Sequence, residues 1–243
     1  MKNRGKCRFA GTHYNRSAAL CYHCCMQIEA LGLVKVFPAP LFSGGRPLRA
    51  LDGLDLTAAQ GVTGLEGPNG SGKTTLLRTL AGILRPDGGA LSADGETAAP
   101  ERLRTLAALC PANPRTFYFR LSALENLRFF GALAGLAPAV SKERALALAG
   151  RLALSAEDLE RRFDRLSEGN MQKVSLIRAF SRRTPALFLD EPFRGLDEKA
   201  RAGLLELIAE TGRGSAVLLS SHLPELLRAA ASRVIKVEAG RTL

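Results

Sequence analysis

The sequence predicts an α/β domain, and two stretches carry this prediction. A glycine-rich segment, Gly67–Thr75, lies between an apolar strand-like run and a helical pattern of leucines. Much further along the chain, the apolar run Ala186–Leu189 is typical of a buried strand, and it ends in Asp190 and Glu191. Polar residues at strand ends, with helical patterns between the strands, indicate a sheet covered by helices.

The glycine-rich segment matches G-x-x-x-x-G-K-[ST] at every fixed position, as it reads Gly67, Pro68, Asn69, Gly70, Ser71, Gly72, Lys73, Thr74 and Thr75. Its glycines let backbone N–H groups turn inward toward phosphate oxygens. Lys73 supplies a positive charge for the β and γ phosphates, and the Thr74 hydroxyl is a ligand for Mg²⁺. The segment therefore predicts a nucleotide-binding P-loop; the alternative is a glycine-rich turn that binds nothing.

The elements around the P-loop follow from periodicity and turn residues. Two strand-like runs precede it, at Ile28–Phe37 and Leu48–Leu56, with a turn-rich segment between them. After the P-loop we expect a helix over Thr74–Leu84 and a strand over Thr105–Cys110. Phe37 lies about 30 residues before the P-loop, where an aromatic ring can stack on an adenine; the alternative is a core residue.

A helical insert is expected at about residues 112–165, between two halves of a strand-rich core. Its helices begin at a capping box formed by Ser122 and Glu125, and then cover Ser141–Ala153 and Ser155–Arg162. The last of these carries a second box, Ser155-x-x-Asp158. The insert therefore separates the P-loop from the acidic strand end in the sequence.

The second half of the chain holds the other candidates for chemistry. Asp190 is placed to hold Mg²⁺ through water, and Glu191 to polarise an attacking water. Ser167 and Gly169 open a helix, where a hydroxyl and exposed N–H groups make a second anion site. His222 follows the apolar strand Ser215–Ser221, so its imidazole can hydrogen-bond a γ phosphate; the alternative is an ordinary surface or core histidine.

Composition excludes some classes of protein. The 243 residues are enough for one large α/β domain or for two small ones. No run approaches the roughly 18 apolar residues that span a bilayer, so the chain cannot form a pore by itself. The net charge of +11 first suggests a nucleic-acid partner. Beyond residue 25 the basic residues are spread out, which favours a solvated arginine-rich surface and no nucleic-acid partner.

Residues 1–25 differ from the rest of the chain. They carry five basic residues and no acid, with the metal-ligand types Cys7, His13, Cys21, His23, Cys24 and Cys25. The Cys21-x-x-Cys24 spacing is half of a zinc site, which His13, His23 or Cys7 would complete. A second Cys/His pair at regular spacing is missing, and Met26 directly precedes the first strand pattern. The favoured interpretation is therefore a disordered tail or a start-site artefact, with the domain covering residues 26–243.

Together these motifs resemble the ATP-binding subunit, or nucleotide-binding domain, of ABC transporters. The resemblance covers about Met26–Leu243. Gly67–Thr75 is similar to the Walker A of that family, Leu187–Glu191 to its Walker B with the catalytic glutamate, and Leu166–Asn170 to its LSGGQ signature. Gly195–Asp197 is similar to the D-loop, His222 to the switch histidine, and Phe37 to the A-loop aromatic.

The resemblance implies a P-loop NTPase fold of ABC type, with a mixed-sheet ATP-binding core and a helical insert. It implies ATP and Mg²⁺ as ligands, Glu191 as general base, and His222 as the residue that positions water and phosphate. It also implies a head-to-tail dimer, of two copies or with a paralogous ATPase subunit, in which Ser167 and Gly169 contact the γ phosphate of the other subunit. The insert would receive a membrane permease, which places the chain at the cytoplasmic face of the membrane as a peripheral subunit.

The sequence departs from the family pattern at two motifs. Ala112 stands where the family usually has a glutamine that contacts Mg²⁺ and water, with Asn113 as a shorter neighbour. The signature reads LSEGN, so that Glu168 replaces a glycine and Asn170 a glutamine. The site is expected to survive both replacements, although a carboxylate near the γ phosphate can weaken the ATP-bound dimer.

One stretch indicates the kind of ABC protein. Arg115–Leu121, followed by Glu125–Phe130, resembles exporters whose permease is a separate chain, the group that moves drugs, lipids or polysaccharides. The expected function is an ATP-hydrolysing subunit that powers export through such a permease. The alternatives are a soluble ABC ATPase acting on ribosomes, DNA or cluster assembly, and an inactive nucleotide-binding module, motivated by Ala112 and Glu168.

Overall fold

The computed structural model describes residues 26–39, 46–114 and 116–243. The predictions made for residues 1–25, namely a tail, an artefact or a metal site, lie outside the described residues, and so does Arg115 of the exporter-like stretch. In the part of the chain that is described, none of the helices combines the length and apolar character needed to cross a membrane.

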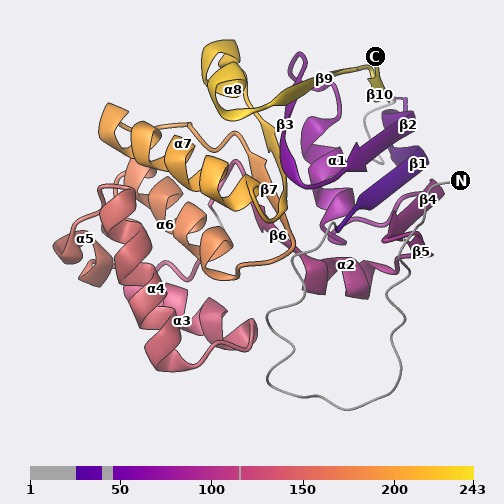
Figure 1. The fold of residues 1–243 in the computed structure, drawn as a ribbon. Coiled ribbons are helices and arrows are strands. Elements are labelled where there is room, and N and C mark those ends of the chain that lie inside the picture. Colours follow the sequence, from indigo (N-terminus) through magenta and orange to yellow (C-terminus); the bar gives the residue numbers. More distant parts are fainter. Residues whose placement is uncertain (1–25, 40–45, 115) are drawn as a thin grey trace, which may run out of the picture.

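Two β-sheets form the centre of the fold (Figure 1). An antiparallel sheet has the order β2-β1-β4-β5, from β1 (Ile28–Phe37), β2 (Leu48–Ala58), β4 (Gly88–Ala93) and β5 (Glu96–Thr97). The larger sheet has the order β10-β9-β3-β8-β7-β6, from β3 (Gly61–Glu66), β6 (Ala107–Cys110), β7 (Ala186–Asp190), β8 (Ala216–Ser220), β9 (Arg233–Glu238) and β10 (Arg241–Thr242). All its pairs are parallel except β9 with β10.

Helices cover the larger sheet. Figure 1 shows α3 (Ala123–Leu133), α4 (Pro138–Arg151) and α5 (Ala156–Glu160) at the end of the molecule away from the antiparallel sheet. The 3₁₀ helix η2 (Phe163–Arg165) leads from this group to α6 (Glu168–Ser181). The other helices are α1 (Lys73–Leu80), α2 (Pro100–Leu106), α7 (Glu198–Gly212) and α8 (Pro224–Ala230).

The larger sheet separates two hydrophobic cores. Along β7, Leu187 and Leu189 pack into the core shared with α3 to α7, whereas Ala186 and Phe188 pack into the core shared with α1 and the antiparallel sheet. This alternation follows because successive side chains of a strand point to opposite faces. A parallel strand buried on both faces reads as a continuous apolar run, which is why β7 is recognisable in the sequence.

Most of the predicted elements are confirmed, but several boundaries are wrong. The strand expected over Thr105–Cys110 begins only at Ala107, because the preceding residues belong to α2, which has Pro100 in its first turn. The helix expected over Thr74–Leu84 ends at Leu80, because Gly82 turns the chain in the left-handed region, with φ of 70°.

The predicted insert helices also differ in detail. The capping box of Ser122 and Glu125 is confirmed, with both reciprocal hydrogen bonds present. The helix expected over Ser141–Ala153 begins earlier, at Pro138, and Ser141 is buried with its hydroxyl donating to the Leu127 carbonyl. The capping box at Ser155 is only half formed. The Ser155 hydroxyl accepts a hydrogen bond from the Asp158 N–H, as expected. The Asp158 carboxylate, however, accepts a hydrogen bond from the Ser155 hydroxyl and not from the Ser155 N–H.

Candidate functional site

The P-loop connects the end of β3 to the start of α1. Two of its glycines are required by close approach of other backbone. A Cβ on Gly67 would overlap the carbonyl oxygen of Val237, and a Cβ on Gly72 would overlap that of Ala50. Gly72 also has φ of 105° as the residue that precedes α1. The loop therefore packs tightly against β2 and β9 on its outer side, while the first N–H groups of α1, which have no partner within the helix, point outward from the helix start.

Lys73 is folded over this loop. Its side chain is 7% exposed, and Nζ donates to the carbonyl oxygens of Gly67 at 2.7 Å and Pro68 at 2.9 Å and to Ser71 Oγ at 3.3 Å. Burial lowers the pKa of Lys73, although the nearby carboxylates of the acidic pair act in the opposite direction. The lysine is thus a positive charge held in a fixed position at the loop, suited to an anion.

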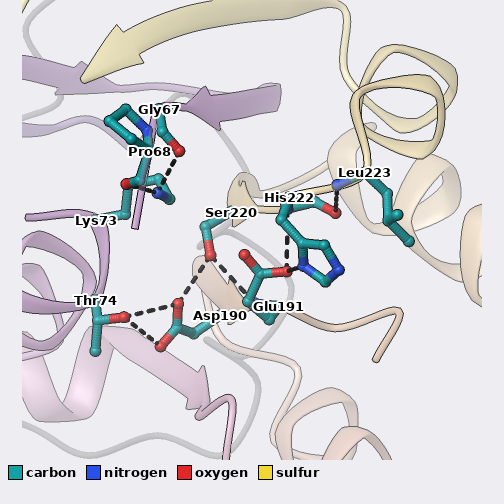
Figure 2. A network of polar contacts seen from close by, with 10 residues as sticks. Gly67, Pro68, Lys73, Thr74, Asp190, Glu191, Ser220, His222 and Leu223 are labelled. Carbon is teal, nitrogen blue, oxygen red and sulfur yellow. Dashed lines mark hydrogen bonds and ion pairs between the residues drawn. The ribbon is translucent and has the colours of Figure 1, made fainter. Parts of the chain in front are cut away.

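A network of polar side chains faces the P-loop (Figure 2). The Thr74 hydroxyl lies 2.9 and 3.1 Å from the two carboxylate oxygens of Asp190. Ser220 Oγ donates to Asp190 Oδ1 at 2.8 Å and accepts the N–H of Glu191 at 3.1 Å. Glu191 Oε2 lies 2.6 Å from His222 Nδ1 and also accepts the His222 N–H at 3.1 Å. Two carboxylates, an imidazole and two hydroxyls therefore form one connected group.

Strand register explains how these residues meet. Strands β7 and β8 are parallel neighbours, and Asp190 is paired with Ser220 at their carboxyl ends. Glu191 is the first residue after β7, and His222 is the second residue after β8. Parallel strands end at one edge of a sheet, and ligands of α/β proteins bind at that edge. Ser220 was not among the residues predicted for the site; its only signal in the sequence is a hydroxyl at the end of an otherwise apolar strand.

Glu191 has an unusual backbone. Its φ is 48°, in the left-handed region, which costs a residue with a Cβ roughly 1–2 kcal/mol. The surrounding contacts compensate, because its N–H is bonded to Ser220 and its carboxylate to His222. Strained backbone of this kind is frequent where a side chain must be aimed at a ligand.

A pocket of about 220 Å³ lies in front of the network. It is lined by the loop residues Asn69 to Thr75, by both acids, and by Phe37, Leu48 and Ala50 on the side of the antiparallel sheet. Phe37 is half-buried, and Lys35 Nζ lies 5.8 Å from its ring centroid. The half-buried ring lies at the pocket and outside both hydrophobic cores. An aromatic wall, a loop of N–H groups and an acidic edge thus share one opening.

Ser167 and Gly169 do not line this pocket. Ser167 precedes α6 and its hydroxyl accepts the N–H of Asn170 at 3.2 Å, so the predicted helix start is confirmed. Glu168 is exposed and forms an ion pair with Arg194 at 2.8 Å. Within one chain, the structure therefore leaves the signature-like segment apart from the P-loop.

A buried lysine connects this segment to the chain after the acidic pair. Lys173 of α6 is 4% exposed, and its Nζ donates to Asp197 Oδ2 at 2.6 Å and to the Ala153 carbonyl at 3.0 Å. Asp197 also caps α7 by accepting the Ala200 N–H. The hydrogen bond from Lys173 is the main reason that the pKa of Asp197 lies below its usual value.

The loop after β6 contributes less to the pocket than the family pattern implies. Ala112 and Asn113, which follow Cys110, are absent from the residues that line the pocket. Cys110 itself is fully buried, and burial raises the pKa of its thiol to about 11. The thiol is therefore protonated at neutral pH.

The fold and this site define a P-loop nucleotide-binding protein. A glycine-lined loop joins a strand of a parallel sheet to a helix, and an acidic strand end lies opposite.

The sequence model of the family described as ABC transporter matches residues 51–194. The chain is 32% identical over 200 residues to the ABC transporter ATP-binding protein NatA of Bacillus subtilis, covering 81% of each chain. It is 36% identical over 200 residues to the daunorubicin resistance ATP-binding protein DrrA3 of Streptomyces coeruleorubidus, covering 80% of this chain and 62% of that protein. The chain thus spans less than two thirds of the length of the Streptomyces relative.

Solved structures agree with this. The chain is similar to an ATP-binding subunit of an ABC transporter, with a TM-score of 0.75, 28% identity, and coverage of 88% of this chain and 87% of the other. The chain belongs to the ABC transporter family, and it is an ATPase domain of that family. The expected fold class, an α/β P-loop domain of ABC type with mixed sheets, is confirmed.

Proposed function

We propose that this chain binds ATP with Mg²⁺ at the P-loop pocket, hydrolyses it, and thereby powers export of a substrate through a separate membrane permease. The observation that carries the proposal is the connected group of Thr74, Asp190, Ser220, Glu191 and His222 opposite a glycine-lined loop (Figure 2). Such a group serves no packing purpose at an open edge, but it provides the parts that phosphoryl transfer to water needs.

Each part has a distinct proposed role. The loop N–H groups and Lys73 bind the phosphates, and the Phe37 ring stacks on the base. Glu191 accepts a proton from the attacking water as general base. His222 holds the Glu191 carboxylate through Nδ1, which leaves its Nε2 for the γ phosphate or the water.

The donor set fits a magnesium ion. A hydroxyl oxygen of Thr74 and carboxylate oxygens of Asp190 lie within 3.1 Å of each other, and hard oxygen ligands are those that Mg²⁺ prefers. We propose these two residues as its protein ligands, with the phosphates supplying others. When bound, the ion neutralises charge that develops on the transferred phosphate. Asp190 is 3% exposed, so it keeps a fixed orientation toward Thr74.

We further propose that two ATPase subunits form the complete site. Ser167 and Gly169 lie at an exposed helix start outside the pocket, where N–H groups are available to an anion on another molecule. A second copy, or a paralogous ATPase subunit, would present this segment to the γ phosphate. The dimer would then depend on ATP, and hydrolysis would reopen it.

The proposal also includes a separate membrane permease that exports the substrate. The exporter-like stretch that precedes and opens α3 supports it, as does the resistance name of the Streptomyces relative. In this arrangement the chain is a peripheral subunit at the cytoplasmic face of the membrane. The exporter stretch does not identify the cargo, because the permease chain selects it.

The first experiment separates binding from hydrolysis. Glu191→Gln removes the general base but keeps a side chain of the same size, so ATP hydrolysis should fall at least about a hundredfold while ATP still binds. Size-exclusion chromatography with ATP should then detect an ATP-dependent dimer. Glu225→Gln changes an exposed carboxylate on α8 and should leave both properties unchanged. A Glu191→Gln protein that binds ATP but stays monomeric at micromolar concentration would contradict the shared site.

The second experiment tests the transport role. The chain is combined in proteoliposomes with a candidate permease, and ATP-driven movement of candidate drugs and lipids is measured in both directions. Export should require ATP and stop with Glu191→Gln. If the substrate moves only toward the ATPase side, the chain powers import and not export. If the chain has full ATPase activity but binds no permease, the alternative of a soluble ABC ATPase is favoured.

A further inference from the structure

The end of strand β8 contains a residue whose role extends the proposed hydrolysis site. Ser220 is fully buried, and it is the only hydroxyl-bearing residue of β8, whose other members are Ala216 to Leu219. Buried hydroxyls in apolar strands are placed where they satisfy a specific partner. Ser220 has two such partners, and both belong to the acidic pair of β7.

The chemistry of the hydroxyl fixes the direction of both hydrogen bonds. A serine hydroxyl has a single proton and two lone pairs. Because the Glu191 N–H donates into Ser220 Oγ at 3.1 Å, the serine's own proton is directed to Asp190 Oδ1 at 2.8 Å. One side chain therefore restrains two acids at once: the carboxylate of Asp190 and the backbone of Glu191.

The two contacts act on a strained backbone and on a buried carboxylate. Glu191 has φ of 48°, and the bond to its N–H holds the peptide in that left-handed conformation. Asp190 is also bonded to Thr74, but the same Thr74 hydroxyl is a proposed metal ligand. When the threonine oxygen turns to a metal ion, Ser220 remains as the protein donor that orients the Asp190 carboxylate.

Ser220 and His222 complete a clamp on Glu191. Ser220 is the last residue of β8, and His222 follows it in the bend that leads to α8. Ser220 holds the Glu191 backbone, and His222 holds its carboxylate at 2.6 Å. Figure 2 shows Ser220 between Asp190 and Glu191, with the His222 ring on the other side of the Glu191 carboxylate.

From this geometry we infer that Ser220 is a positioning residue for hydrolysis, which orients the metal-binding carboxylate of Asp190 and the general base Glu191 together. The inference rests on the proposed function. It predicts that the hydroxyl controls the rate of hydrolysis and the affinity for the metal, but not the binding of nucleotide by the P-loop.

The test compares a pair of variants that have nearly the same shape. Ser220→Thr keeps the hydroxyl, and Ser220→Val replaces it with a methyl group of similar volume; both are suited to a strand. Ser220→Ala removes the hydroxyl without adding volume. The full chain is used, with kcat and KM for ATP, and with Mn²⁺ affinity measured by paramagnetic resonance in the presence of a non-hydrolysable ATP analogue.

We expect Ser220→Val and Ser220→Ala to lower kcat by about tenfold to a hundredfold, the ratio that follows from losing hydrogen bonds to charged or strained groups. Mn²⁺ affinity should fall by about tenfold, while KM for ATP and the affinity for ATP without metal stay within about twofold of wild type. Ser220→Thr should restore kcat and Mn²⁺ affinity to within about threefold of wild type.

The same strands offer a matched control. Ser215 precedes β8 at its other end, and its hydroxyl donates to the Thr184 carbonyl just before β7, at 3.2 Å. Ser215→Ala thus removes a hydroxyl that joins the same two strand segments far from the acids. Its kcat and Mn²⁺ affinity should match wild type, even where its midpoint of thermal unfolding falls as far as that of Ser220→Ala.

The outcomes are distinguishable. An active wild type whose Ser220→Val variant keeps kcat and Mn²⁺ affinity within about twofold would overturn the inference and leave the proposed function intact. Equal losses in Ser215→Ala and Ser220→Ala would also overturn it, because the serine would then act only through strand stability. A wild type that neither binds nor hydrolyses ATP would overturn the proposed function, and this inference with it.

Discussion

The P-loop and the helix start at Ser167, the two segments that we propose bind phosphate, differ in how many contacts they make within the chain. The P-loop is surrounded by its own partners: Lys73 is buried against loop carbonyls, and Thr74 already contacts Asp190. The helix start at Ser167 is exposed, and its neighbour Glu168 pairs with Arg194 at the surface. The difference teaches that one chain brings the P-loop and the acidic pair together by itself, whereas the signature-like segment lies at the surface, where we propose that a second ATPase subunit meets it.

The largest expected effect concerns the P-loop. Lys73→Ala removes the buried positive charge of the P-loop, so affinity for ATP should fall by about a hundredfold or more, as expected for loss of charge-assisted contacts. Isothermal titration calorimetry measures this directly. Lys142→Ala, an exposed lysine on α4, is the control and should bind ATP like wild type. Unchanged affinity in Lys73→Ala would mean that the nucleotide binds elsewhere.

The next effect concerns the ion pair of Lys173 and Asp197, which connects α6 to the start of α7. Lys173→Met breaks the ion pair between α6 and the residue that caps α7, leaving Asp197, which is half-exposed, to be solvated by water. We expect a loss of about 1–2 kcal/mol in the free energy of unfolding, below that of a fully buried pair. Urea unfolding of Lys173→Met and of the exposed control Lys199→Met compares the two. Equal stability would show that the pair contributes nothing measurable.

The same ion pair predicts a pH dependence. Because the pKa of Asp197 is lowered in the folded state, its contribution to stability is present above its unfolded pKa and is lost as the pH falls through the lower, folded value. The wild type should therefore lose stability below about pH 4 more steeply than Lys173→Met, in which the main cause of the lowered pKa is gone. Unfolding curves recorded from pH 5 to pH 3 test this, and parallel curves for the two proteins would contradict it.

The smallest effect on stability is expected in the signature-like segment. Glu168→Gly and Arg194→Ala both break an exposed ion pair, so each should change the free energy of unfolding by less than about 1 kcal/mol. Their effects on the ATP-dependent dimer should be opposite. Glu168→Gly removes a carboxylate near the proposed γ phosphate site and should strengthen the dimer a few fold, whereas Arg194→Ala leaves that carboxylate unpaired and should weaken it. Sedimentation with ATP measures the dimer affinity of both variants. If the affinity changes in the same direction in both, the charge of Glu168 does not explain the effect.

Several features of the site were predictable because they depend on neighbours in the sequence. A phosphate loop needs glycines, a lysine and a hydroxyl in consecutive positions, and Gly67–Thr75 supplies them. Asp190 and Glu191 were predictable because a doubly buried strand is a continuous apolar run, after which two acids are conspicuous. The capping box at Ser122 was predictable because its two hydrogen bonds lie within one turn.

Other features were not predictable because they depend on residues distant in the sequence. Helix α2 takes in Thr105 and Leu106 although both were expected in the next strand. Two residues next to a strand boundary carry too weak a pattern to decide between helix and strand. The pairing of Lys173 with Asp197 and of Glu168 with Arg194 joins residues more than 20 positions apart, and many other lysines and acids were available as partners.

The sequence by itself determined that this chain has a P-loop domain, since local chemistry specifies the loop, the acidic strand end and the apolar strands, and the resemblance of its motifs indicated the ABC type. Only the tertiary structure decided that Ser220 bonds both Asp190 and Glu191, and that Phe37 lies at the pocket and outside the core. The physical reason is strand register: a shift of one residue between β7 and β8 would turn the serine to the opposite face, and nothing in the sequence of either strand alone fixes that alignment.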